Sequence, residues 1–438
     1  MSKLYAAFGE FEIPAPIGAI TSGWMPPLRP VRFKTEPLLG NVAMLKNEEA
    51  LLVLYSMDLL GLETEDCERI RREVAEAVST DYACVSISCT HNHAGPNSML
   101  CDTPKDPQLV EQLRQKMVQS AKELLPRLEP AVMGWGFTYE SELSGNRRYV
   151  LKDGTVRTHP QLNKVEVLYA EGPIDPVVGV VCVRDMEGLA LGYLVNFACH
   201  PLFYGGQGIA SPNYPGELRK ELKRLERPEC VCLFLNGACG DICPGNPLKK
   251  EKLSNSDVGI RLAQRSYEVA LGAQYTADVA LGGKAGQVAI SKRTFSPQQL
   301  ERAERVVNGE TELRIDSKWF PISTLPNTEF AQMILTLHEQ VQKEPTSCQP
   351  LQTMRIGETV WAFCPGELFV KYGMALKVRS KERLTFVSTY SNGNVGYLFT
   401  PEAQESGGYE PTPVLYSHHD CTAGAAIVDG LCNLLETT

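Results

Sequence analysis

The sequence has no excess of basic residues: 43 Lys and Arg stand against 52 Asp and Glu, so the 438-residue chain has a net charge of −9. Binding to nucleic acid or to an anionic membrane surface requires basic patches, and here Lys and Arg are scattered. No apolar run reaches the length of a membrane span, and the apolar stretch before Glu10 is too short for a signal peptide. We therefore expect a cytoplasmic protein with neither a nucleic-acid nor a membrane partner.

Cys-x-x-Cys pairs are also missing, although the chain contains 14 cysteines. Disulfide frameworks are typical of short, loop-rich, secreted chains, and this chain has none of these features. Most of its cysteines, such as Cys84, Cys182 and Cys232, lie within apolar segments, where a thiol behaves as a small hydrophobic group. We expect free thiols in a reducing compartment.

The chain has no internal repeat, low-complexity tract or linker. Patterns typical of strands and helices alternate along it instead. Strands are predicted at 50–57, 83–88, 177–184, 189–198, 230–235 and 359–364, and helices at 64–79, 107–125, 215–225, 297–309 and 422–435. This alternation predicts an α/β fold with a mixed β-sheet core flanked by helices, in a single domain over residues 1–438. Residues 248–356 have few chemically active side chains, and we interpret them as scaffold or a substrate-side subdomain.

Histidine is scarce, yet two of the seven lie in the segment Cys-Thr-His-Asn-His-Ala-Gly-Pro at 89–96. Side chains alternate along an extended backbone, so His91 and His93 are expected to project into one site from the end of the preceding strand. Imidazole is the commonest metal ligand and the side chain that titrates nearest neutral pH. In one interpretation of this pair, one ring binds a metal and the other transfers a proton. In the other interpretation, both rings donate hydrogen bonds to a polar turn.

Polar residues able to bind a metal or move a proton follow four predicted strands. They are His91 with His93, His200, Asp241 and Glu367. In open α/β folds the ligand site lies beyond the carboxyl ends of the strands, so we expect these residues to gather there. Two histidines with one carboxylate form a common catalytic zinc set that leaves a position for water. A metal site at the C-terminal ends of the strands is therefore predicted.

Short motifs follow one another from about Ile13 to the C-terminus. They are His-Asn-His-Ala-Gly-Pro at 91–96, Phe-Ala-Cys-His at 197–200, Gly-Asp-Ile-Cys-Pro-Gly-Asn at 240–246, Pro-Gly-Glu at 365–367, Ser-Asn through Tyr-Leu-Phe-Thr at 391–400, and Tyr-Glu at 409–410. In this order they resemble the motifs of the catalytic domain of the neutral, non-lysosomal ceramidases, a family of zinc amidases. The resemblance implies a single ceramidase-like catalytic domain without the C-terminal β-domain of longer family members.

The resemblance also implies roles for individual residues. The Zn²⁺ ligands would be His91, His200, Glu367 and Tyr397. His93 would transfer a proton beside the metal-bound water, while Arg147 and Tyr409 would stabilise the oxyanion. Cys243, with Asp241 in the same motif, would line the substrate site.

The motif at 240–246 departs from the family pattern, because Cys243 replaces a serine and Gly245 is inserted. A cysteine is a weaker hydrogen-bond donor than a serine hydroxyl. Since ceramide resides in a bilayer and this chain is acidic, we expect hydrolysis of a linear amide in a small or moderately polar N-acyl compound. The sequence leaves two alternatives open: a cysteine hydrolase with Cys243 as nucleophile, and a non-catalytic binding protein on the same fold.

Overall fold

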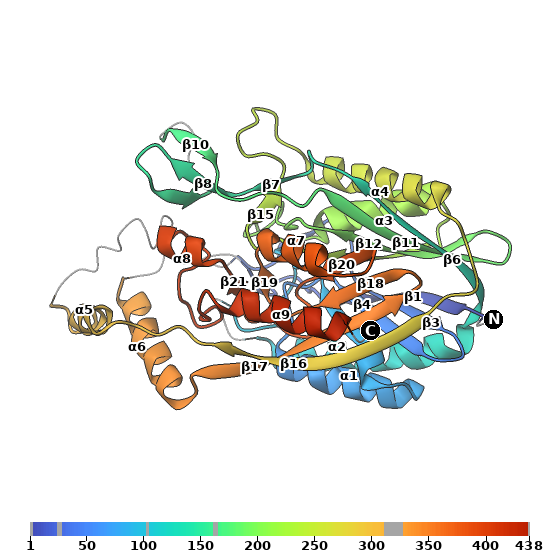
Figure 1. Cartoon of the computed structure of the whole chain (residues 1–438), viewed down its shortest axis with the longest axis horizontal. Coiled ribbons are helices and arrows are strands. Elements are labelled where there is room, and N and C mark those ends of the chain that lie inside the picture. The colour runs from blue at the N-terminus through green and yellow to red at the C-terminus, as the bar shows by residue number, and fades with distance from the viewer. Residues whose placement is uncertain (1–2, 24–28, 102–104, 161–164, 311–326, 437–438) are drawn as a thin grey trace.

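The computed structural model describes residues 3–23, 29–101, 105–160, 165–310 and 327–436 (Figure 1). Two β-sheets lie against each other within it. The larger sheet has the strand order β14 (Val231–Asn236), β12 (Ala190–Phe197), β11 (Val177–Asp185), β6 (Glu129–Tyr139), β1 (Tyr5–Ile13), β3 (Leu38–Lys46), β4 (Leu51–Met57) and β5 (Val85–Cys89). The smaller sheet has the order β16 (Leu281–Ser291), β17 (Thr346–Ile356), β18 (Thr359–Phe363) and β20 (Leu384–Ser388).

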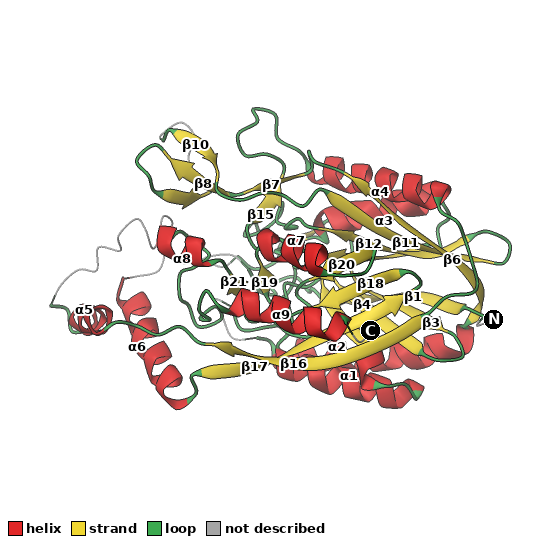
Figure 2. Cartoon of the chain, in the orientation of Figure 1, coloured by secondary structure: helices red, strands yellow, loops and turns green. Residues whose placement is uncertain are grey.

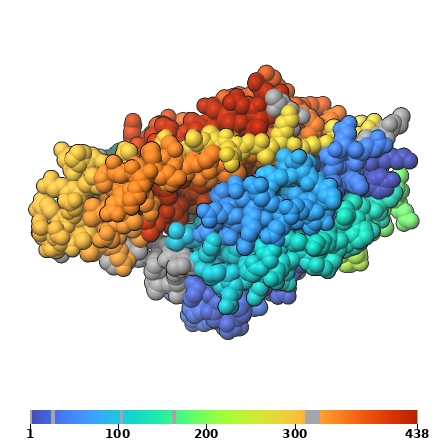
Figure 3. Space-filling view, turned by 90° about the horizontal axis from the view of Figure 1, so that it is seen from below, coloured from blue at the N-terminus to red at the C-terminus, as the bar shows by residue number. Residues whose placement is uncertain are grey.

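Helices cover the outer face of each sheet (Figure 2). The larger sheet is covered by two helix pairs, α1 (Thr64–Val78) with α2 (Pro107–Leu124), and α3 (Asn213–Leu225) with α4 (Asn255–Gly272). The smaller sheet is covered by α7 (Val370–Arg379) and α9 (Ala423–Leu435). The first pair forms much of the surface seen in Figure 3, in blue and cyan. The result is a mixed α/β fold with helices outside and sheets inside, which confirms the predicted class.

The packing follows from strands that are apolar on both faces. On β4, Val53 packs toward the helices, whereas its neighbour Leu54 packs between the sheets. On β18, Trp361 lies in the core between the sheets, whereas Val360 faces α9. Side chains alternate along a strand, so a continuous apolar run fills two cores at once. All four side chains are fully buried.

Shorter elements complete the described part of the chain. They comprise a three-stranded sheet of β10 (Val167–Ala170), β8 (Arg148–Leu151) and β9 (Val156–Thr158), the strand pairs β2 (Phe33–Lys34) with β13 (Ile209–Ala210), β7 (Ser144–Asn146) with β15 (Ile242–Pro244), and β19 (Glu367–Leu368) with β21 (Tyr397–Leu398), and the helix α8 (Pro401–Ser406). Helices α5 (Pro297–Val307) and α6 (Asn327–Lys343) project at one end of the molecule, as Figures 1 and 3 both show.

The predicted strands and helices lie within a few residues of the observed ones, and the capping box at Ser296 is present. The antiparallel pair of β16 and β17, whose strands pair over their whole length, was not predicted. Its first strand contains three glycines, which have low strand propensity. All 14 cysteines are free, as expected. None of the helices in the described ranges is both long and apolar enough to cross a bilayer.

Candidate metal centre

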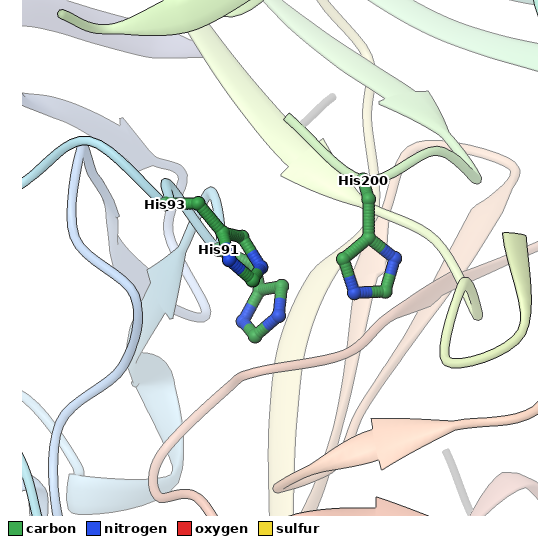
Figure 4. A group of neighbouring side chains, drawn as sticks. All are labelled: His91, His93 and His200. Atoms are coloured by element: carbon green, nitrogen blue, oxygen red, sulfur yellow. The ribbon is translucent and has the colours of Figure 1, made fainter. Parts of the chain in front are cut away.

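Three histidines form a compact cluster at the carboxyl ends of the strands. Ligand nitrogens of His91, His93 and His200 all lie within 4.8 Å of one another. His91 and His93 follow β5, and His200 follows β12 from the other side (Figure 4). The rings of His91 and His200 are 1% and 0% exposed, so bulk water does not solvate them. The two segments, which are more than 100 residues apart in the sequence, therefore supply one site.

The backbone that carries His91 is not extended, contrary to the sequence-based expectation. β5 ends at Cys89, and His91 has a φ of 64°, in the left-handed region. The amide of Thr90 donates to Met57 O (2.8 Å) and that of Asn92 to Leu59 O (2.9 Å), so the loop is fixed to the end of β4. The two rings do meet, but they do so through a tight turn.

In each of the three rings, Nδ1 lies close to a backbone carbonyl oxygen. The partners are Leu60 O (3.0 Å), Gly23 O (2.6 Å) and Ile242 O (2.8 Å), for His91, His93 and His200 respectively. A carbonyl only accepts, so each Nδ1 carries a proton, and in the neutral form of each ring Nε2 is the nitrogen with the free lone pair. All three Nε2 atoms are buried without a hydrogen-bond partner among the described residues. This arrangement is typical of histidines that ligate a metal.

Glu367 adds a carboxylate to the cluster. Its Oε2 lies 3.3 Å from Nε2 of His91 and 3.3 Å from Nε2 of His200, and it too lacks a hydrogen-bond partner among the described residues. Burial raises the pKa of Glu367, whereas the His91 and His200 rings, when protonated, lower it below its usual range. Burial, followed by the Arg147 guanidinium, lowers the pKa of His200 to about 3, which keeps that ring neutral.

Tyr397 lies opposite Glu367, because β19 pairs with β21 in register. Its hydroxyl accepts a hydrogen bond of 3.0 Å from Nη2 of Arg147. Arg147 also donates to Gly240 O (2.7 Å) and, through Nε, to Glu410 (2.9 Å). The Tyr409 ring lies 5.6 Å from that of Tyr397. The structure thus brings all of these predicted site residues to one place.

A cavity of about 20 Å³ opens onto the cluster. Its described lining includes the predicted site residues His91, His93, Glu367, Tyr397 and Tyr409. The rest of the described lining was not predicted; it consists of Gly23, Leu60, Met99, Cys101, Asn394 and Tyr416. Of these residues, only Asn394 lies within one of the motifs described above, the motif at 391–400.

The two predicted substrate residues lie apart from this cavity. Asp241 accepts hydrogen bonds from Val370 N (2.8 Å), at the start of α7, and from Asn146 Nδ2 (2.7 Å). Cys243 lines a separate cavity of about 460 Å³ and donates to Gly145 O (3.5 Å). Burial raises the pKa of the Cys243 thiol to about 12, which opposes the thiolate that a nucleophile requires. The geometry does not favour the cysteine-hydrolase alternative.

Comparison with known proteins supports the fold-level resemblance. The structure of neutral ceramidase from Pseudomonas aeruginosa superposes with a TM-score of 0.72 at 17% sequence identity, covering 100% of this chain and 75% of that one. A ceramidase complexed with C2 superposes with a TM-score of 0.73 at 16% identity, covering 100% and 76%. Neither a protein-family model nor a curated protein sequence matches the chain. The chain is therefore an α/β protein with a buried candidate metal centre, and its fold is that of the neutral ceramidases.

Proposed function

We propose that this chain is a zinc-dependent hydrolase that cleaves a linear amide bond in a small or moderately polar N-acyl compound. The observation that carries the proposal is the set of buried, unpaired atoms in the cluster. Three imidazole Nε2 atoms and Glu367 Oε2 point to one place, and none has a hydrogen-bond partner in the described part of the chain. Leaving such groups unpaired costs about 1–3 kcal/mol each. A cation held by His91, His200 and Glu367 and a water held by His93 would pair all four atoms.

The proposed Zn²⁺ ligands are His91, His200, Glu367 and Tyr397. Two histidine nitrogens with one carboxylate oxygen are a common zinc set, to which Tyr397 would add a fourth, oxygen ligand. When bound, the ion supplies a Lewis acid that lowers the pKa of water toward neutrality and polarises a carbonyl group.

His93 is proposed as the proton-transfer residue. Burial, followed by the neighbouring His91 and His200, lowers its pKa well below the usual range, so the ring is neutral and its Nε2 is a proton acceptor. Nδ1 is held by Gly23 O, which leaves Nε2 facing the cluster. In this role the ring accepts a proton from the attacking water and returns it to the leaving amine.

Arg147 and Tyr409 are the proposed oxyanion-stabilising groups. Arg147 is buried and oriented by three hydrogen bonds, to Glu410, Gly240 O and Tyr397. A donor fixed before the reaction stabilises developing charge without reorganisation, and removing one such donor costs about 3–4 kcal/mol. Three tyrosines, Tyr397, Tyr409 and Tyr416, lie in the wall of the cavity, and their hydroxyl groups support a moderately polar substrate. The free thiols support a cytoplasmic location.

A panel of N-acyl amines, N-acyl amino acids, N-acyl sugars, matching esters and ceramide analogues tests the proposal. We expect turnover of a polar N-acyl compound that a chelator abolishes, that added zinc restores and that Cys243→Ser leaves largely intact. Turnover that survives complete metal removal would contradict the proposed chemistry. Rapid turnover of ceramide in bilayers would contradict the proposed substrate class.

A further inference from the structure

Asn92 lies between His91 and His93 in the sequence and is fully buried. Its Nδ2 donates to Asp58 O (3.2 Å) and Ser211 O (2.9 Å), and its Oδ1 accepts from Ala94 N (3.0 Å) and Asn213 Nδ2 (2.6 Å). A side-chain amide offers two donors and two acceptor positions, so all four are used. The backbone partners accept only or donate only, and they fix which end of the amide is which.

Asn213 belongs to the segment that follows His200. It is the first residue of α3 and has a φ of 54°, a left-handed conformation that asparagine tolerates better than most residues. Its own Oδ1 accepts from Tyr204 N (3.2 Å), so this side chain is also held from both ends. The hydrogen bond between Asn92 and Asn213 therefore joins the loop of His91 and His93 to the segment that carries His200.

A buried ion pair reinforces this junction. Arg219 of α3 donates to both carboxylate oxygens of Asp58, at 3.0 Å and 2.6 Å. Asp58 directly follows β4, and its carbonyl oxygen is one of the acceptors of Asn92. The exposed fractions of Asp58 and Arg219 are 0% and 4%. Helix α3 is thus anchored at the strand end from which the histidine loop departs.

We propose that Asn92 is a positioning residue, which acts through Asn213 to set the separation between the loop of His91 and His93 and the ring of His200. The strength with which the cluster holds a metal ion then depends on this amide pair. The inference rests on the proposed metal site. It adds a residue that contacts neither the metal nor the substrate.

Zinc affinity of metal-free protein, measured by competition with a chromophoric chelator, tests the proposal. In Asn92→Asp, one carboxylate oxygen replaces the donor that faces Asp58 O and Ser211 O. We expect zinc affinity to fall by about 10- to 100-fold, the range typical of lost partners of metal ligands. Far-UV circular dichroism and the unfolding midpoint of the same metal-free samples report whether the variant is folded.

Asn47→Ala is the matched control. Asn47 is 5% exposed, donates to Val279 O (3.0 Å) and accepts from Glu49 N and Ala50 N (both 2.8 Å). It lies between β3 and β4, at the opposite end of β4 from the cluster. We expect this variant to lose stability but to keep wild-type zinc affinity. An equal loss of zinc affinity in both variants would reduce Asn92 to a general stability residue and overturn the proposal.

A double-mutant cycle tests the link itself. Asn213→Ala leaves three of the four hydrogen bonds of Asn92 in place, so it also carries the test if Asn92→Asp fails to fold. We expect Asn92→Ala and Asn213→Ala each to weaken zinc binding, and the double variant to be no weaker than the worse single variant. If the wild type binds zinc, two results would overturn this inference and leave the proposed function standing. One is fully additive losses of zinc-binding free energy in the double variant, and the other is unchanged zinc affinity in folded single variants. A wild-type protein that binds no zinc would overturn the proposed function, and this inference with it.

Discussion

The imidazole ring of His91 lies face to face with the phenol ring of Tyr390, with centroids 3.9 Å apart and planes inclined by 16°. Both residues have a positive φ, 64° and 54°, which is unusual for residues other than glycine. The Tyr390 carbonyl accepts from Cys89 N (3.0 Å), and its hydroxyl lies 3.2 Å from Cys239 Sγ. Such backbone conformations persist where the surroundings enforce them, and they concentrate at functional sites. The stack fixes the plane in which His91 presents Nε2.

Replacing Tyr390 tests whether the stack orients the ring. We expect Tyr390→Leu to weaken zinc binding by about tenfold or more, because an outer partner of a metal ligand is lost. Tyr390→Phe keeps the ring and removes only the hydroxyl, so its zinc affinity should stay near that of the wild type. Chelator competition measures both. Equal affinities for the two variants would show that the stack does not orient His91.

Glu410 is a buried carboxylate that binds two guanidinium groups. It accepts from Arg147 Nε (2.9 Å), Arg148 Nη1 (2.7 Å) and Thr158 Oγ1 (2.8 Å). Removing one partner of a buried ion pair leaves an unpaired charge, so Glu410→Gln should lower the free energy of unfolding by about 3–5 kcal/mol. Urea unfolding of the metal-free protein measures this. As the control, Glu166→Gln should cost under about 1 kcal/mol, because Glu166 and its partner Lys152 are 72% and 67% exposed.

The same carboxylate predicts an acid-dependent loss of stability. Burial raises the pKa of Glu410, but Arg148 and then Arg147 outweigh it and lower the pKa from its ordinary value of 4.5 to about 2. A lowered pKa contributes stability that is fully present above the unfolded-state value and is lost as the pH falls toward the folded-state value. The stability difference between wild type and Glu410→Gln should therefore shrink between about pH 5 and pH 2. A stability difference that stays constant between about pH 5 and pH 2 would contradict the lowered pKa of Glu410.

The strand ends were predictable because they depend on local patterns. Runs such as 50–57 and 359–364 are apolar on both faces, and each has turn-forming residues after it, so their ends could be placed from the sequence. His91, His200 and Glu367 each follow the end of a different strand. They meet because several of the strands run parallel in the sheets.

Other features depend on contacts between distant segments. The left-handed turn at His91 is enforced by carbonyl groups of Met57 and Leu59, which no local pattern around residue 91 reveals. Tyr390 was not predicted as a site residue, and its stacking partner His91 lies about 300 residues away in the sequence. The hydrogen bonds that the Asp241 carboxylate accepts from Val370 N and Asn146 Nδ2 join segments far apart in the sequence, so they could not be predicted from its motif.

His93 tests the division of labour within the cluster. We expect His93→Ala to keep its zinc and to lose roughly two to four orders of magnitude in kcat, the range typical of a removed general acid–base. His418→Ala is the control, because His418 binds Leu415 O (2.9 Å) and is not among the described residues that line the cavity. Zinc loss in His93→Ala would make His93 a ligand, since its ring belongs to the three-histidine cluster. Retained zinc with normal kcat would leave it a structural residue.

The metal content of the purified protein tests the central claim most directly. Elemental analysis of the wild type and of His91→Ala/His200→Ala, purified side by side, gives the number of zinc ions per chain. We predict one zinc ion per wild-type chain and none in the double variant, because both rings supply an unpaired Nε2 to the same place. A wild type without zinc, or a double variant with its full zinc content, would contradict the account.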